Sequence, residues 1–180
     1  MLTPEFVLDL LTDLESDRIE RTTSTGNTDK FAQAICAFGN DYPGHRKPGY
    51  LIVGANDDGS LAGLTVTDEL LRNLGGIRAD GNVLPPPAMS VEKVVLPGGE
   101  VAVVQVQPST VPPIRYKGRV YIRTGPRKGI ANEQEEVAES YRLTYRRWQT
   151  YPAYGYRWHP HRKQTSAGAD RQSLPTTSSR

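Results

Sequence analysis

The chain has 180 residues, a formal net charge of +2 and a single cysteine, Cys36. A chain of this length can bury one domain core and still leave a tail, and one cysteine excludes an intramolecular disulfide. No apolar run approaches the about 18 residues of a membrane span. Glu5 and Asp9 stand where a signal peptide would carry basic residues. We therefore expect a cytoplasmic protein without a membrane segment.

The spacing of apolar and capping residues predicts helices over residues 4–14, 29–40, 68–74 and 133–148. Apolar and alternating runs predict strands over residues 16–25, 50–53, 61–64, 90–96, 101–106 and 114–123. Hairpins outnumber crossovers in this order, which favours α+β over a doubly wound sheet. We predict an α+β fold with a mixed, mostly antiparallel sheet of about five or six strands flanked by three or four helices.

Composition divides the chain into three parts. Residues 1–148 carry the predicted helices and strands and form the expected domain. Residues 149–164 are rich in aromatic and basic side chains, and we interpret them as an extension of that domain. Residues 165–180 consist largely of Ser, Thr, Gly, Gln and Arg, with little to bury, so we predict that they are disordered.

Two groups of carboxylates flank the second predicted helix and the strand after it. Glu15 and Glu20 precede the helix, and Asp57 and Asp58 follow the apolar strand. If these elements pack side by side, the carboxylates could meet, and carboxylates held close need a cation between them. Mg²⁺ and Mn²⁺ prefer oxygen ligands, so the pattern is compatible with a divalent-metal site for phosphate esters. A helix end, a pairing of Glu20 with Arg18 and an ordinary turn explain the same residues without a metal.

The second feature is a basic segment in which residues 114–130 contain no acid. Its cations are Arg115, Lys117, Arg119, Arg123, Arg127 and Lys128. Arg119, Tyr121 and Arg123 would share one face of a strand. Aromatic residues interleave with further arginines up to residue 158, and cations with stacking rings are typical of a nucleic-acid surface. Arg46 and Lys47, on a predicted loop, are further candidates for phosphate contacts. A solvated basic strand is the alternative.

A nucleotide site has less support. Gly54 and Gly59 have the glycine spacing of a P-loop, but Ser60 stands where the phosphate-binding lysine belongs. Two acids occupy a loop that would have to hold anions, and the sequence contains no Gly-x-Gly-x-x-Gly dinucleotide motif. An ATP-binding protein is therefore the weakest of the alternatives.

Four motifs together resemble the Schlafen-type, Alba-like domain, in a bacterial single-lobe form. They are Glu-Ser-x-x-x-Glu at residues 15–20, Ala-x-Cys-Ala-Phe-x-Asn at 34–40, Gly-Tyr-Leu-Ile-Val-Gly-x-x-Asp-Asp-Gly at 49–59 and Tyr-x-Gly-x-x-Tyr-Ile-Arg-x-Gly at 116–125. Each motif is weak alone, and jointly they are specific. The resemblance covers residues 15–139 and implies a nucleic-acid-binding lobe.

The resemblance also implies chemistry. In animal Schlafen cores two lobes form a horseshoe that binds tRNA or rRNA, and two Glu and one Asp form a metal-dependent endoribonuclease site. By motif these are Glu15, Glu20 and Asp57, with Asp58 as the second choice, and the ion would be Mg²⁺ or Mn²⁺. A chain with one lobe would need a homodimer to supply the other.

Two departures from the family pattern keep two classes of function open. Asn56 occupies the first slot for the Asp, and Arg21-Thr22 replace the usual Phe-Lys after the second Glu. The three retained acids favour an endoribonuclease acting on structured RNA such as tRNA. The departures favour a non-catalytic regulator that binds DNA or RNA.

Overall fold

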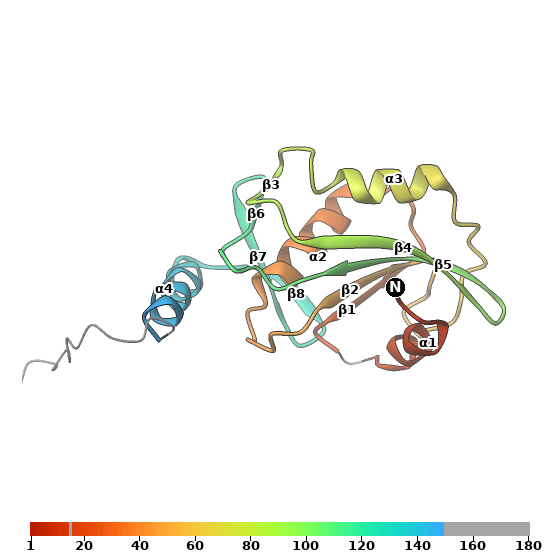
Figure 1. Ribbon diagram of the computed structural model, residues 1–180, viewed down its shortest axis with the longest axis horizontal. Helices are drawn as coiled ribbons and strands as arrows, with labels where there is room; N and C mark the ends of the chain where they lie inside the picture. Colours follow the sequence, from red (N-terminus) through yellow and green to blue (C-terminus); the bar gives the residue numbers. More distant parts are fainter. Residues whose placement is uncertain (15, 150–180) are drawn as a thin grey trace, which may run out of the picture. The chain divides into compact units, whose positions relative to one another are not determined.

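The computed structural model describes residues 1–14 and 16–149, the side chains of 142–149 excepted, and Figure 1 shows the helices and strands that these residues form. The helices are α1 (Pro4–Thr12), α2 (Thr28–Asn40), α3 (Asp68–Gly76) and α4 (Glu133–Gln149). The strands are β1 (Ile19–Thr22), β2 (Gly49–Val53), β3 (Val83–Leu84), β4 (Met89–Leu96), β5 (Gly99–Val106), β6 (Arg115–Tyr116), β7 (Arg119–Thr124) and β8 (Arg127–Ile130).

The first sheet has the order β1-β2-β5-β4 and is covered by helices on both faces. β1 pairs with β2 in parallel, with Ile19 opposite Tyr50, and the other pairs are antiparallel. All five residues of β2 are buried because the strand is central and covered on both sides. α2 and α3 pack on one face and α1 on the other, and Figure 1 shows α1 and α3 on opposite sides of the sheet.

The second sheet has the order β3-β6-β7-β8 and lies against α2. Asn40, at the end of α2, is buried and binds the backbone of two segments of this part of the fold. Its amide nitrogen donates to the carbonyl oxygens of Ile114 (3.0 Å) and Tyr121 (2.8 Å), and its oxygen accepts from the amide of Ile114 (2.6 Å). α2 is thus the helix on which both sheets pack.

The predicted α+β class is confirmed, with four helices in the described part of the chain and mostly antiparallel strands. The strands divide between two sheets of four rather than forming one sheet. β3 and β8 were not predicted, and the strand predicted over residues 61–64 is reduced to a bridge between Ala55 and Leu61. Gly63, with φ +70°, turns the chain away from the sheet directly after this bridge.

Among the described residues, no helix is both long and apolar enough to cross a membrane. The aromatic and basic extension predicted at residues 149–164 lies outside the described part of the chain except for Gln149. The tail predicted at residues 165–180 lies outside it entirely.

Candidate nucleic-acid interface

Three lysines from distant parts of the sequence gather around the first turn of α2. Lys30 belongs to that turn, and Lys128, on β8, donates from Nζ to the carbonyl oxygen of Lys30 at 3.2 Å. Lys117, in the β6–β7 turn, lies 2.9 Å from the carboxylate of Asp29. The fold therefore collects positive charge where the second sheet meets α2.

The β6–β7 turn that carries Lys117 is fixed by local geometry and by its contact with α2. Lys117 and Gly118 both have positive φ, +48° and +77°, as the tightest hairpin turns require. The hydroxyl of Tyr116 also donates to Asp29. Hydrogen bonds from Tyr116 and then Lys117 lower the pKa of Asp29, while the Asp29 carboxylate raises the pKa of Lys117. Asp29 thus holds the turn against the helix.

Two arginines next to these lysines have no acidic partner within the part of the chain that the structure describes. Arg119 begins β7 and Arg127 begins β8, and both side chains are exposed. We refer to Lys30, Lys117, Arg119, Arg127 and Lys128 as the basic patch. Arg115, also predicted from the sequence, pairs at 2.7 Å with Glu136 of α4 and not with a residue at the start of α2, so we do not include it in the basic patch.

Arg123, by contrast, is buried, with 4% of its side chain exposed. Of the predicted shared face of Arg119, Tyr121 and Arg123, Arg119 is exposed, whereas Tyr121 and Arg123 pack toward α2. The guanidinium lies over the ring of Phe38, 5.4 Å from its centroid. It is ion-paired with Glu20 and donates to the carbonyl oxygens of Ile19 (3.3 Å) and Pro126 (2.8 Å). Because its guanidinium is buried and already ion-paired, we do not include Arg123 in the basic patch.

Arg46 and Lys47 lie on the exposed loop between α2 and β2, outside the basic patch. Asp41 shapes this loop because its carboxylate accepts from the amides of His45 (3.0 Å) and Arg46 (2.8 Å). Lys47 lines a small cavity together with Arg123. The loop is therefore a separate group of exposed cations.

The predicted carboxylates do not converge in the described part of the chain. Glu20 points away from α1, because its β1 neighbours Ile19 and Arg21 face that helix. Arg21 caps the C-terminal end of α1, because it donates to the carbonyl oxygens of Leu10 (2.6 Å) and Leu11 (3.2 Å). Burial lowers the pKa of Arg21, and the charges of Asp13 and Asp57 oppose this shift. The aspartate turn therefore lies on the α1 side of the sheet and Glu20 on the other.

The turn at residues 56–60 is itself packed against the end of α1. A β-carbon on Gly59 would lie 2.1 Å from the carbonyl oxygen of Leu11. Asp58 accepts from the hydroxyl (2.6 Å) and the amide (2.9 Å) of Ser60, and these bonds lower its pKa. Asp58 therefore serves the turn rather than facing Glu20.

A divalent ion does not fit the described carboxylates. No three His, Cys, Asp or Glu side chains of residues 1–14 and 16–149 could hold a metal together. Glu15, the remaining predicted ligand, lies outside the described residues. The carboxylate of Glu20 already faces two cations, Arg123 and Lys128, the latter at 3.7 Å. An ion bound there would have to displace or repel both of them.

Sequence reasoning missed Lys30 and the role of Asp29. Lys30 is one lysine in an amphipathic helix, and nothing in its neighbourhood in the sequence marks it. Its importance comes only from Lys117 and Lys128, which are 87 and 98 residues away. The helix-start position of Asp29 indicates a favourable interaction with the helix dipole, but not a contact with Tyr116.

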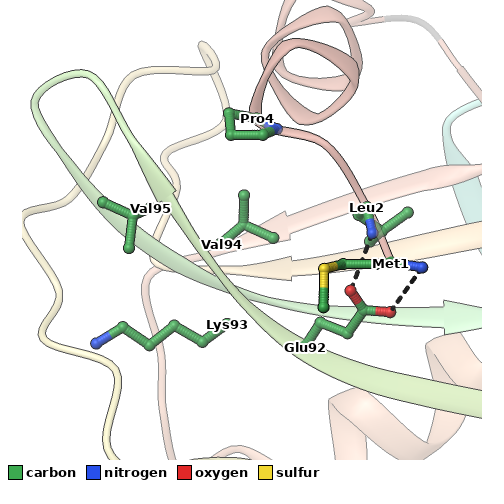
Figure 2. A pocket seen from close by; sticks show the side chains of 7 residues that line it. All are labelled: Met1, Leu2, Pro4, Glu92, Lys93, Val94 and Val95. Atoms are coloured by element: carbon green, nitrogen blue, oxygen red, sulfur yellow. Dashed lines mark hydrogen bonds and ion pairs between the residues drawn. The ribbon is translucent and has the colours of Figure 1, made fainter.

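A wider pocket of about 620 Å³ lies at the β4 edge of the first sheet, the edge opposite β1 (Figure 2). Met1, Leu2, Pro4 and residues 92–95 line it. Glu92 accepts from the amide of Leu2 at 2.9 Å and lies 3.9 Å from the amino group of Met1. None of the predicted site residues reaches this pocket.

Residues 15–132 match the family model described as Schlafen, AlbA_2. The solution structure of the N-terminal domain of a RecG-related protein from Nitrosomonas europaea, named for an ATP-dependent DNA helicase, is 23% identical with a TM-score of 0.50. That comparison covers 89% of this chain and 100% of the domain. The DIP2311 protein from Corynebacterium diphtheriae is 18% identical with a TM-score of 0.47, and the match covers 71% of this chain and 29% of that one. No curated protein matches the sequence.

Proposed function

Because the chain belongs to the Schlafen AlbA_2 family, we propose that it binds nucleic acid and that the basic patch is its contact surface. The family suggests a nucleic-acid-binding domain, and the proposal adds the surface and the preferred ligand. We take structured RNA, such as tRNA, as the ligand, because the Schlafen cores that the sequence resembles bind tRNA or rRNA.

The observation that carries the proposal is the convergence of cations from three distant segments on one turn of α2. Lys30, Lys117 and Lys128 come from a helix, a hairpin turn and an edge strand, and Arg119 and Arg127 flank them without acidic partners among the described residues. All members of the basic patch except the half-buried Lys128 are exposed, and exposed cations gain most of their binding energy from phosphates by releasing counterions. A basic surface that contacts phosphates and follows the shape of its ligand suits structured RNA.

The proposal is for binding rather than cleavage. The predicted metal-dependent site would need carboxylates that share an ion, and Glu20 and the Asp57 turn lie on opposite faces of the first sheet. Mg²⁺- or Mn²⁺-dependent endoribonuclease activity by Glu15, Glu20 and Asp57 therefore has no support from the described geometry. Incubating the protein with total tRNA and Mn²⁺, with EDTA as the control, tests for it directly.

Filter binding over a range of salt concentrations tests the basic patch. The Arg119→Gln variant should bind tRNA more weakly, and the slope of log affinity against log salt should fall by roughly 0.7–0.9 for the lost contact. The matched control is Arg72→Gln, which removes one exposed charge from α3 and should change the slope little. If both variants lowered the slope equally, binding would depend on the overall charge of the protein and not on the basic patch, which would contradict the proposal.

Competition between tRNA and duplex DNA of equal length distinguishes the ligands. The RecG-related neighbour is named for a DNA helicase. If duplex DNA displaced bound tRNA more readily than tRNA displaced DNA, the ligand would be DNA rather than RNA.

The homodimer expected from the single-lobe form also stays a prediction. Light scattering with and without tRNA tests it, and a monomer mass in both samples would exclude it.

A further inference from the structure

The starting point is a carboxylate that joins two parts of the fold. Glu20 lies on β1 of the first sheet, and Arg123 lies on β7 of the second. Their ion pair connects residues 103 apart in sequence. One oxygen of Glu20 accepts from Arg123, and the other lies 3.7 Å from Nζ of Lys128 on β8. A single side chain of β1 therefore faces both strands of the β7–β8 hairpin.

Arg123 depends on this carboxylate. A guanidinium that is 4% exposed carries a charge that must be compensated inside the protein. Among the described residues, Glu20 is its only acidic partner, and Nε of Arg123 has no hydrogen-bond partner. Its other contacts are the carbonyl oxygens of Ile19 and Pro126 and the ring of Phe38. Without Glu20, Arg123 would be a buried charge compensated by two backbone dipoles and one aromatic ring.

Arg123 in turn holds the hairpin that presents part of the basic patch. Its guanidinium donates to Pro126, inside the β7–β8 turn, at 2.8 Å. Arg127 follows that turn directly, and Lys128 is the next residue. A continuous chain of contacts thus runs from β1 through Glu20, Arg123 and Pro126 to the exposed Arg127. Burial lowers the pKa of Lys128 and the charge of Glu20 raises it, so Glu20 also favours the charged form of that lysine.

We propose that Glu20 is a positioning residue of the basic patch, acting through Arg123, and that it is not a metal ligand. This inference depends on the proposed function in one respect only, namely that the basic patch binds nucleic acid. The anchoring of the β7–β8 hairpin can be tested without any nucleic acid. The sign of the effect on binding is distinctive. Removing a negative charge near phosphates should strengthen binding by simple electrostatics, whereas losing an anchor for the patch should weaken it.

The first experiment compares Glu20→Gln with Glu69→Gln, which removes an exposed carboxylate from α3. Glu20→Gln should lower Tm by on the order of 5 °C, since it leaves a buried charge poorly compensated. Hydrogen exchange should accelerate in residues 119–130 of this variant and not in α3. Glu20→Asp, which keeps the charge, should restore part of the protection. Unchanged exchange in residues 119–130 would overturn the anchoring.

The second experiment measures tRNA binding below the Tm of every variant. Glu20→Gln should weaken binding about tenfold, and Glu69→Gln should not weaken it. Arg127→Gln should add little to the loss in the Glu20→Gln background, because both changes act on one contact. Stronger binding by Glu20→Gln, or full additivity with Arg127→Gln, would refute positioning. Absence of salt-dependent binding by the unmodified protein would instead refute the proposed function and leave the exchange result standing.

The third experiment titrates Mn²⁺ into the unmodified protein, Glu20→Gln and Asp57→Asn, with calorimetry as the readout. The proposal expects no stoichiometric binding that depends on Glu20. Stoichiometric Mn²⁺ binding that both substitutions abolish would assign Glu20 to a metal site and overturn the second half of the proposal.

Discussion

Replacing Asn40 with Ala should be among the most destabilising single substitutions in this fold. The side chain is 2% exposed, and its amide makes three hydrogen bonds of 2.6–3.0 Å to Ile114 and Tyr121. The carbonyl of Ile114 keeps one partner in the variant, since the thiol of Cys36 also donates to it. The amide of Ile114 loses its only side-chain acceptor among the described residues.

The magnitude follows from these bonds. Each contributes about 1 kcal/mol net, and an unsatisfied buried amide costs about 1–3 kcal/mol. Two lost bonds from the side-chain nitrogen and the unsatisfied amide of Ile114 together predict a loss of roughly 3–5 kcal/mol in the free energy of unfolding. Urea denaturation measures it, with Asn73→Ala on the exposed side of α3 as the control, for which we expect less than about 0.5 kcal/mol. A loss below about 1 kcal/mol for Asn40→Ala would contradict the view that this amide joins α2 to the second sheet.

Two further predictions concern a turn and a carboxylate. Gly59→Ala should cost about 2–4 kcal/mol of unfolding free energy, because it combines a φ of +84° with a β-carbon 2.1 Å from Leu11. Gly63→Ala, with φ +70° and open space, should cost only about 1 kcal/mol, and equal costs would exclude the contact with α1 as the cause. The pKa of Asp29 is lowered by Tyr116, so its stabilising contribution is present above the unfolded pKa and is lost as pH falls through the folded pKa. An NMR titration should find this pKa below the ordinary value and closer to it in Tyr116→Phe; an ordinary pKa in the unmodified protein would count against the Asp29 contacts.

The elements that the sequence predicts well have strong local signals. α2 is capped by Asn27 and carries a full apolar face, and β2 is apolar throughout. β8 was missed because Arg-Lys-Gly-Ile has little strand propensity, and it forms only because β7 offers an edge to pair with. β3 has two residues and precedes three prolines, so its pairing with β6 has no local signature.

The candidate site was predictable in composition and not in arrangement. The acid-free basic segment contains four of the five cations of the basic patch, and Arg119, Lys117 and Arg127 are exposed there. Alternation also places Arg119 and Arg123 on one face of β7, but it does not say which part of that face a helix covers. Likewise, the spacing of Glu20 and Asp57 gives no information on the side of the sheet toward which the turn after β2 folds. Gly59 lets that turn approach α1, and this approach places the turn on the α1 side of the sheet.

The parallel pairing of β1 with β2 has a consequence for the order of folding. The β4–β5, β6–β7 and β7–β8 pairs are hairpins whose strands are joined by short turns, so they can form locally. β1 can reach β2 only after α2 and its flanking loops have been enclosed, a loop of on the order of 25 residues with a closure entropy near 3 kcal/mol plus a constant. We therefore expect low φ-values for β1 and higher ones for the hairpins. Glu20 would then reach Arg123 late in folding, so the guanidinium stays hydrated until β1 docks.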